Sequence, residues 1–251
     1  MASEWLAYGD LAWTEDWLAD PAEYEAEVGV YVELLERYAT PPLRTLLHLG
    51  CGAGGHDRVF KRYFSVTGVD LSPAMLAEAR ARHPDVEYVE GDMRAVRLGR
   101  RFDAVAIPDS IDYMASREDL ERAIGTAVAH LRPGGVLLVV GKPSEIFRDN
   151  DFVYSGERDG VHITVFENDH VDPSRPNTYE ATLVYLIRRR GELTIRTDRH
   201  VLGLFPQAVW DEVFADAGLT VREHTLEGVY DTHLLGDGAY PMRVFIGRRR
   251  E

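Results

Sequence analysis

The stretch LHLGCGAGG at residues 47–55 decides the fold, because an apolar run passes directly into a cluster of glycines. Glycine lets the backbone turn sharply and approach a ligand closely, and a helix that starts after the turn offers free amide groups. Gly50, Gly52 and Gly55 also satisfy the G-x-G-x-x-G spacing of dinucleotide sites. By itself the stretch leaves several alternatives open: a dinucleotide site, a site for another ligand, or a tight structural turn.

Outward from this turn, short β-branched runs alternate with helical stretches, as expected for a parallel sheet covered on both sides. One helix is well marked, because Ser72 is placed to cap it, Pro73 suits its first position, and Met75, Leu76 and Ala79 repeat at helical spacing. The predicted strands are 45–49, 65–70, 86–90, 102–107 and 135–141.

The alternation of strands and helices stops around Ser144, where three extended segments follow one another without helices. These segments are 162–167, 178–187 and 193–202. A helix from Pro206 to Gly218 and two closing strands, 219–226 and 240–248, come next. We therefore predict a doubly wound, Rossmann-like α/β fold with a seven-stranded sheet. Its parts are an N-terminal helical lid over 1–42, a main domain over 43–145 and 205–251, and an antiparallel β insertion over 146–204.

Charge and cysteine content narrow the class of protein. The 251 residues carry a formal net charge of −14, which disfavours phosphate backbones and anionic lipid as partners. The single cysteine, Cys51, excludes an internal disulfide and fits a reducing compartment. The N-terminus lacks the order of a signal peptide, and no run approaches the roughly 20 apolar residues that span a bilayer. We expect a cytoplasmic protein without nucleic-acid or membrane partners.

Acidic residues follow the next two predicted strands. Asp70 ends the second strand, twenty positions beyond Gly50, where a carboxylate can bind the two hydroxyls of a ribose. This position suits either NAD or an adenosyl group, and a simple strand-end cap is the structural alternative. Asp92 and Met93 follow the third strand, where an acid can accept a hydrogen bond from an adenine amine. Enzymes that bind dinucleotides do not need an acidic residue at the end of the third strand. Asp70 together with Asp92 and Met93 therefore favours an adenosyl group.

Together, LHLGCGAGG, VTGVDLSPAML, VEGDM and LRPGGVLLVV resemble the successive motifs of class I S-adenosylmethionine-dependent methyltransferases, over nearly the whole chain. The resemblance implies S-adenosyl-L-methionine as cofactor. It also implies a role for each motif. The glycine turn approaches the methionine part of the cofactor, and Asp70 binds the ribose. Met75 or Leu71 flanks the adenine ring, and the residues at the end of the third strand bind the edge of that ring. The implied binding residues are Gly50, Cys51, Gly52, Asp70, Leu71, Met75, Asp92 and Met93.

GDMRAVRLGRRFDAV and HVLGLFPQAVWDEVFADAGL look like a closer group, the bacterial small-molecule N-methyltransferases that dimethylate aminosugars in natural-product pathways. In that group an N-terminal aromatic segment closes over the cofactor. We expect the antiparallel insertion of this chain to form the acceptor side. The residues on matching positions are Trp13, Trp17, Tyr24, His56, Tyr113 and His200. The stretch PDSIDYM, with Asp109 and Asp112, departs from the group's Ser-rich pattern, which leaves the acceptor open.

The chemistry of methyl transfer sets what else to look for. The displacement needs alignment in a dry pocket, and an amine acceptor must also lose a proton, to bulk water or to a base. Our candidate catalytic residues are Asp109, Tyr113 and His200, with Asp112 and His162 as further bases. Each has a plain alternative, namely helix capping for the aspartates and packing for the others. No metal is predicted, because no ligand spacing is present.

The sequence thus predicts transfer of a methyl group to the nitrogen of a small amine, with an aminosugar as candidate. Residues 108–111 read Pro-Asp-Ser-Ile and lack the signature of methyltransferases that act on nucleobases. The alternatives are O-methylation of a small metabolite, an NAD-dependent oxidoreductase, and a non-catalytic cofactor-binding protein. The acceptor, the number of methyl groups and the oligomeric state, a homodimer included, stay open.

Overall fold

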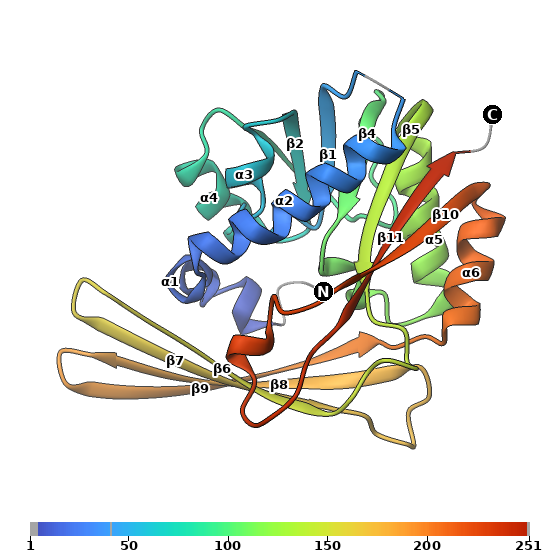
Figure 1. Ribbon diagram of the computed structural model, residues 1–251. Helices are drawn as coiled ribbons and strands as arrows, with labels where there is room; N and C mark the ends of the chain where they lie inside the picture. Colours follow the sequence, from blue (N-terminus) through green and yellow to red (C-terminus); the bar gives the residue numbers. More distant parts are fainter. Residues whose placement is uncertain (1–4, 41, 250–251) are drawn as a thin grey trace.

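The computed structural model describes residues 5–40 and 42–249, which form a seven-stranded sheet and a separate four-stranded sheet (Figure 1). The large sheet has the order β10-β11-β5-β4-β1-β2-β3, and its first five strands in sequence are parallel. Its strands are β1 (Thr45–Leu49), β2 (Ser65–Asp70), β3 (Glu87–Glu90), β4 (Phe102–Ile107), β5 (Leu131–Gly141), β10 (Leu219–Leu226) and β11 (Met242–Arg249). The predicted doubly wound α/β class is confirmed.

The order of the sheet reverses between β1 and β4, since the chain adds β2 and β3 on one side and then crosses to β4 on the other. In open α/β sheets ligands bind at this switch point, beyond the carboxyl ends of the strands. Gly50 directly follows β1, and Asp109 lies two residues beyond β4. The topology therefore brings the glycine turn and the PDSIDYM stretch to the same edge.

Helices cover both faces of the large sheet. They are α2 (Pro21–Tyr38), α3 (Asp57–Phe60), α4 (Pro73–Arg82), α5 (Arg117–Ala129) and α6 (Gln207–Asp216). Alternate residues of β1 enter different cores: Leu46 packs with α2 to α4, whereas Leu47 and Leu49 pack with α5 and α6. A strand buried on both faces reads as a continuous apolar run, which explains residues 45–49.

Local chemistry starts the helices where the sequence indicates. The Ser72 hydroxyl accepts a hydrogen bond from the amide of Met75 at 3.1 Å, and Pro73 is the first residue of α4. Asp20 caps α2 in the same way through the amide of Ala22. The predicted cap of α4 is confirmed.

The second sheet contains β6 (Asn150–Arg158), β7 (Val161–His170), β8 (Thr178–Arg189) and β9 (Glu192–Gly203), each antiparallel to the next. The predicted antiparallel insertion is confirmed, but β6 was missed and the other strands run longer than expected. Two hairpins turn at Asp159-Gly160 and Arg190-Gly191, all four residues with positive φ, as in type I′ turns. β6 is hard to recognise because its Gly156 interrupts the apolar pattern.

The N-terminal segment lies between the two sheets. It comprises the short helices η2 (Leu6–Tyr8), η3 (Ala12–Thr14) and α1 (Glu15–Leu18). Leu11 packs against Ile163 and Val165 of β7. Gly156 allows α1 to approach β6, since an added Cβ would meet the carbonyl oxygen of Trp17 at 1.8 Å. Within the described residues, no helix is long and apolar enough to cross a membrane.

Candidate active site

A cavity of about 700 Å³ lies between the carboxyl edge of the parallel strands and one face of the antiparallel sheet. Its walls come from four regions: the N-terminal helices and α2, the strand ends of the large sheet, residues of the antiparallel sheet, and the segment after β10 that contains Tyr230. A further short helix, η4 (Ser110–Tyr113), follows β4 and borders the cavity beside Gly50. The cavity therefore coincides with the switch point of the sheet.

The glycine turn forms a backbone cradle at one side of the cavity. Gly50 has φ +74°, and a Cβ there would lie 2.2 Å from the hydroxyl oxygen of Ser110. The amides of Gly50 and Cys51 both donate to the carbonyl of Val69, at 2.8 and 3.0 Å. This arrangement holds the backbone open toward the cavity, which is the close approach that a cofactor requires.

Asp70 lies beside this turn and lines the cavity. Its Oδ2 accepts the amide of Gly52 and its Oδ1 accepts the amide of Ser72, both at 2.8 Å. Burial raises the pKa of this carboxyl, while the two amide bonds act in the opposite direction. A carboxylate has about four acceptor sites, so Asp70 keeps capacity for the hydroxyls of a ribose.

The third strand end also lines the cavity, together with Leu71 and Met75. Here Asp92 forms an ion pair with Arg94 at 2.7 Å, and Arg94 also binds Asp119 at 2.9 Å. The hydrogen bonds from Arg94 hold the pKa of Asp92 below its usual value. Contact of Asp92 and Met93 with adenine stays a prediction.

The structure corrects the predicted aromatic cover. Trp13 and Trp17 pack edge to face with ring centroids 5.0 Å apart and lie against the antiparallel sheet, outside the lining of the cavity. Trp5, Tyr8 and Tyr24 line it instead. Trp5 and Tyr8 were missed, because two aromatic residues in a short, aperiodic segment give no sign of which face they occupy.

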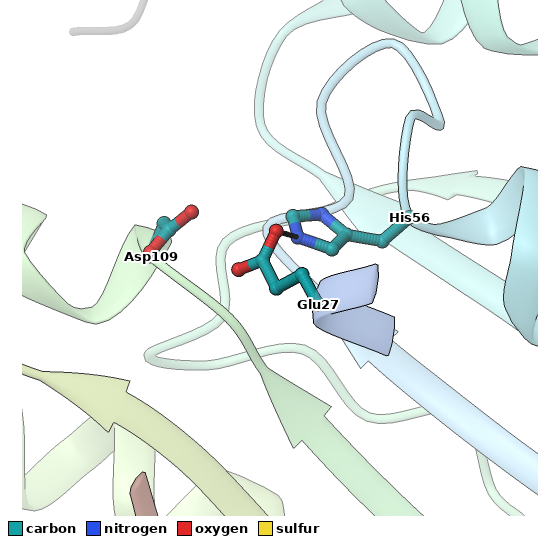
Figure 2. Close-up of side chains that lie close together, drawn as sticks. All are labelled: Glu27, His56 and Asp109. Atoms are coloured by element: carbon teal, nitrogen blue, oxygen red, sulfur yellow. Dashed lines mark hydrogen bonds and ion pairs between the residues drawn. The ribbon is translucent and has the colours of Figure 1, made fainter. Parts of the chain in front are cut away.

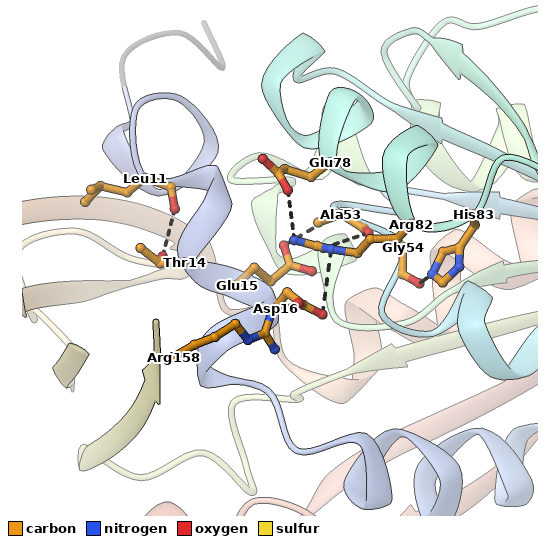
Figure 3. A network of polar contacts seen from close by, with 10 residues as sticks. All are labelled: Leu11, Thr14, Glu15, Asp16, Ala53, Gly54, Glu78, Arg82, His83 and Arg158. Carbon is orange, nitrogen blue, oxygen red and sulfur yellow. Dashed lines mark hydrogen bonds and ion pairs between the residues drawn. The ribbon is translucent and has the colours of Figure 1, made fainter. Parts of the chain in front are cut away.

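Two acidic residues of α1 tie the N-terminal segment to both halves of the molecule (Figure 3). Asp16 pairs with Arg82 of α4 at 3.7 Å and with Arg158 of β6 at 2.8 Å. Glu15 accepts the amide of Ala53, in the glycine turn, at 3.4 Å. Burial raises the pKa of Glu15 to about 7. These contacts fix the N-terminal segment to α4, to β6 and to the glycine turn.

Glu27, His56 and Asp109 gather where α2, the turn before α3 and the end of β4 meet (Figure 2). His56 Nε2 lies 3.1 Å from a carboxylate oxygen of Glu27, and Asp109 accepts a hydrogen bond from the Tyr230 hydroxyl at 2.7 Å. Burial lowers the pKa of His56, but the charge of Glu27, its hydrogen bond to His56, and the charges of Asp109 and Asp57 together outweigh burial and raise the pKa to about 9. His56 is therefore cationic at neutral pH.

This set contains both signs of charge beside the glycine turn. Polar atoms of the three side chains lie within 4.8 Å of one another, a spacing that a metal could also use. Hydrogen bonds from His56 and Tyr31 to Glu27, and from Tyr230 to Asp109, already account for oxygens of both carboxylates. The absence of a metal stays a prediction. Glu27, His56 and Asp109 fit the ammonium and carboxylate groups of an amino acid as well as they fit a metal ion.

A second chain of polar contacts starts at the opposite wall. The Tyr113 hydroxyl lies 2.9 Å from Nδ1 of His200, and His200 Nε2 lies 3.0 Å from Asp198. The Tyr8 hydroxyl also bonds to Tyr113, and the amide of Ala7 donates to Asp198 at 2.8 Å. Since the Asp198 carboxylate accepts from Nε2–H, Nδ1 is the acceptor for Tyr113.

Sequence reasoning found Tyr113 and His200 but missed Tyr8 and Asp198. The alternation of β9 puts Asp198 and His200 on one face, and this period-2 signal could have identified Asp198. His162 is exposed on β7 and does not line the cavity, so it is not a base for this site. Asp112 is buried and paired with Lys142 at 2.7 Å.

A doubly wound sheet with a glycine turn, a strand-end aspartate and an adjoining acidic cavity fits an S-adenosylmethionine-dependent methyltransferase of class I. The comparisons with known proteins agree. Residues 46–135 match the family model described as a methyltransferase domain. Tyr113 and His200 add polar groups beyond the cofactor region, as an enzyme with a second substrate requires.

The relatives are more specific. A dTDP-3-amino-3,4,6-trideoxy-alpha-D-glucopyranose N,N-dimethyltransferase of Streptomyces venezuelae is 35% identical over 210 residues, covering 80% of this chain and 85% of the relative. A dTDP-3-amino-3,6-dideoxy-alpha-D-glucopyranose N,N-dimethyltransferase of Streptomyces fradiae is 34% identical, covering 80% and 79%.

Solved structures agree with the sequences. The crystal structure of Streptomyces venezuelae DesVI superposes with a TM-score of 0.77 at 30% identity, covering 91% of this chain and 92% of that one. The sugar N-methyltransferase KedS8 from Streptoalloteichus gives 0.76 at 27% identity, covering 97% and 93%. The chain belongs to the family of S-adenosylmethionine-dependent methyltransferases that contains these sugar N-methyltransferases. Its cofactor is S-adenosylmethionine, and its activity is the transfer of a methyl group.

Proposed function

We propose that the acceptor is the amino group of an aminosugar, and that the residues above divide into a cofactor wall and an acceptor wall. The names of the relatives support the aminosugar. The observation that carries the mechanism is the chain Tyr113, His200 and Asp198, which ends at the cavity opposite the glycine turn. The net charge of −14 supports a small molecule rather than nucleic acid.

The cofactor wall holds S-adenosylmethionine, which when bound supplies a methyl group on a sulfonium. Gly50 and Gly52 would leave room for its methionine part, and Asp70 would accept hydrogen bonds from the ribose hydroxyls. His56 is placed to pair with the methionine carboxylate, and Glu27 and Asp109 with the ammonium, because the three charges lie together beside the turn.

The acceptor wall removes a proton from the amine. An ammonium that reaches Tyr113 gives a proton to the phenol oxygen while the phenol proton passes to Nδ1 of His200. Burial raises the pKa of Tyr113, so the phenol itself does not remain ionised and acts as a shuttle. Asp198 holds the ring and stabilises the imidazolium that forms.

Asp109 has a different role in this proposal. It has φ +56°, a conformation that costs a non-glycine residue energy and is common at functional sites. Burial raises the pKa of its carboxyl, and the Tyr230 hydroxyl donates a hydrogen bond to it. Its position two residues beyond β4 places the carboxylate beside Glu27 and His56, where it would bind the ammonium of the cofactor's methionine part.

The test compares matched acceptors with purified protein and S-adenosylmethionine. A 3-amino-3,6-dideoxyhexoside and the corresponding 3-hydroxy sugar differ only at the reacting atom. We expect mass gains of one or two methyl groups on the amino compound alone. Methylation of the hydroxy sugar would support the O-methyl alternative instead. Cofactor binding without turnover of any amine would overturn the proposed function.

A further inference from the structure

One buried carboxylate oxygen beside Tyr113 has no hydrogen-bond partner in the part of the chain that the structure describes. It is Oδ1 of Asp112, a residue that is only 3% exposed and yet lines the cavity. A buried polar atom without a partner is costly, so a bound molecule that donates to it would be stabilised. The residues that hold the other such atoms do not line the cavity, and they are His48, Asp57, Tyr88, Asp169, Trp210 and Arg243. Among the described residues, the position of Asp112 alone points such an atom's residue toward the acceptor.

The second oxygen of Asp112 is already engaged. Its Oδ2 lies 2.7 Å from the ammonium nitrogen of Lys142 and accepts a hydrogen bond from the Tyr179 hydroxyl at 3.4 Å. Lys142 directly follows β5, and its ammonium lies 5.5 Å from the ring centroids of both Tyr179 and Tyr240. Because Lys142 balances the charge of Asp112, the open oxygen does not require a second cation. It suits a neutral donor such as a hydroxyl, whose hydrogen bond to a carboxylate is short and strong.

The helix η4 holds Asp112 in a fixed place between the two sheets. At its start, the Ser110 hydroxyl donates to the carbonyl of Leu49, the last residue of β1, at 3.1 Å. Just beyond its end, the carbonyl oxygen of Met114 lies against Gly203, the last residue of β9, where an added Cβ would be 2.2 Å away. A side chain supported in this way can distinguish substrates that differ by one group.

Asp112 and Tyr113 are consecutive residues, and both line the cavity. In the proposed function Tyr113 receives the proton of the amine, so a group that binds Asp112 lies close to that amine. We propose that Asp112 accepts a hydrogen bond from a hydroxyl on the ring carbon next to the amino group, and that it makes the enzyme specific for aminosugars that retain this hydroxyl. The inference rests on the proposed function, because it assumes an aminosugar acceptor.

The expected discrimination follows from the cost of an unpaired carboxylate oxygen. A site that hydrogen-bonds a substrate hydroxyl rejects the analogue without it, because the buried oxygen is then left without a donor. The names of two relatives supply a matched pair of compounds. One names a 3-amino-3,4,6-trideoxy-glucopyranose and the other a 3-amino-3,6-dideoxy-glucopyranose, so the two sugars differ by the hydroxyl at C4.

The experiment measures kcat/KM from initial rates of S-adenosylhomocysteine formation with dTDP-linked 3-aminosugars. One acceptor retains both hydroxyls that neighbour the amine, a second lacks the hydroxyl at C4, and a third lacks the hydroxyl at C2. We expect the loss of one of these hydroxyls to lower kcat/KM at least about 30-fold and the loss of the other to have a much smaller effect.

Rates equal within about threefold for all three acceptors would overturn the inference, because the open oxygen would then be satisfied by water. Methylation of these aminosugars at equal rates would leave the proposed function intact. Failure of every acceptor, with the cofactor shown to bind, would overturn the proposed function itself.

A double variant, Asp112→Leu with Lys142→Met, tests the assigned residue without leaving a buried charge unpaired. We expect kcat/KM for the fully hydroxylated acceptor to fall about 30-fold and kcat/KM for the disfavoured deoxy acceptor to stay nearly unchanged. The preference should therefore disappear, whereas the affinity for S-adenosylhomocysteine should stay the same. A merely structural role would lower the rates for both acceptors alike, and that result would overturn the inference.

The matched control is Asp85→Leu with Lys61→Met. It removes the same two residue types from an ion pair of 2.8 Å that lies outside the cavity. We expect this control to keep the preference of the wild type. The comparison of acceptors with the wild-type enzyme decides the inference even where the Asp112 variant fails to fold.

Discussion

The two walls of the cavity are built in different ways. The cofactor wall uses backbone amides and residues at the ends of β1, β2 and β3, so each contribution comes from a short stretch of sequence. The acceptor wall uses side chains from one face of three antiparallel strands and from η2 and η4. The comparison shows that the general part of the reaction is encoded locally, whereas the part that selects an acceptor is assembled by strand register.

Gly50→Ala should have the largest effect on cofactor binding. The new methyl group would overlap Ser110 at a positive φ, so we expect affinity for S-adenosylhomocysteine to fall by about 4 kcal/mol, roughly 1000-fold. Calorimetric titration measures this loss. Gly99→Ala is the control, since Gly99 has φ +68° and no atom within 4 Å of an added Cβ. Similar affinities for the two variants would mean that the turn does not cradle the cofactor.

The charge set beside the turn predicts a pH dependence. His56 has its pKa raised from 6.5 to about 9, so its pairing stabilises the fold fully below pH 6.5 and is lost as pH rises through 9. The expected loss over this window is about 3 kcal/mol. Chemical denaturation at pH 6 and pH 9.5 should show a larger decrease in the free energy of unfolding for the wild type than for His56→Gln.

The raised pKa of Asp169, about 8, also lowers stability as pH rises. This contribution is common to both proteins and cancels in the comparison. Equal pH dependence of wild type and His56→Gln would contradict the assignment of a cationic His56.

Tyr113→Phe should impair the acceptor side of the cavity and leave the cofactor side unchanged. Loss of the proton shuttle should lower kcat about 100-fold, at the low end of general acid–base effects, with unchanged cofactor affinity. His200→Gln should have a similar effect, and the double variant little more, because both act in one chain. Tyr63→Phe, at an exposed tyrosine, is the control. An additive double variant would show that the two residues act independently.

Asp70→Ala should have the smallest effect of the four. Loss of hydrogen bonds from a charged acceptor should weaken cofactor binding by roughly 1–3 kcal/mol, measured by the same titration. Asp237→Ala, at an exposed loop position, is the control. Unchanged affinity in the Asp70 variant would mean that the ribose lies elsewhere.

Recognition from the sequence succeeded where a residue's role depends on its neighbours in the chain. β1, β2 and β4 have the predicted bounds, and Ser72 caps α4 as expected. It failed where a role depends on the face that a segment presents. Trp13 and Trp17 looked like cofactor cover, but the short helices turn them toward the antiparallel sheet and turn Trp5 and Tyr8 toward the cavity.

By itself, the sequence determined the fold class, the glycine turn and the strand-end aspartates, because backbone conformation and strand periodicity are local properties. The tertiary structure alone decided that Tyr8 and Tyr113 meet His200, and that His233 of the lining is paired with Glu23. These contacts join residues up to more than a hundred positions apart, and only the packing of two sheets against one another brings their charges together.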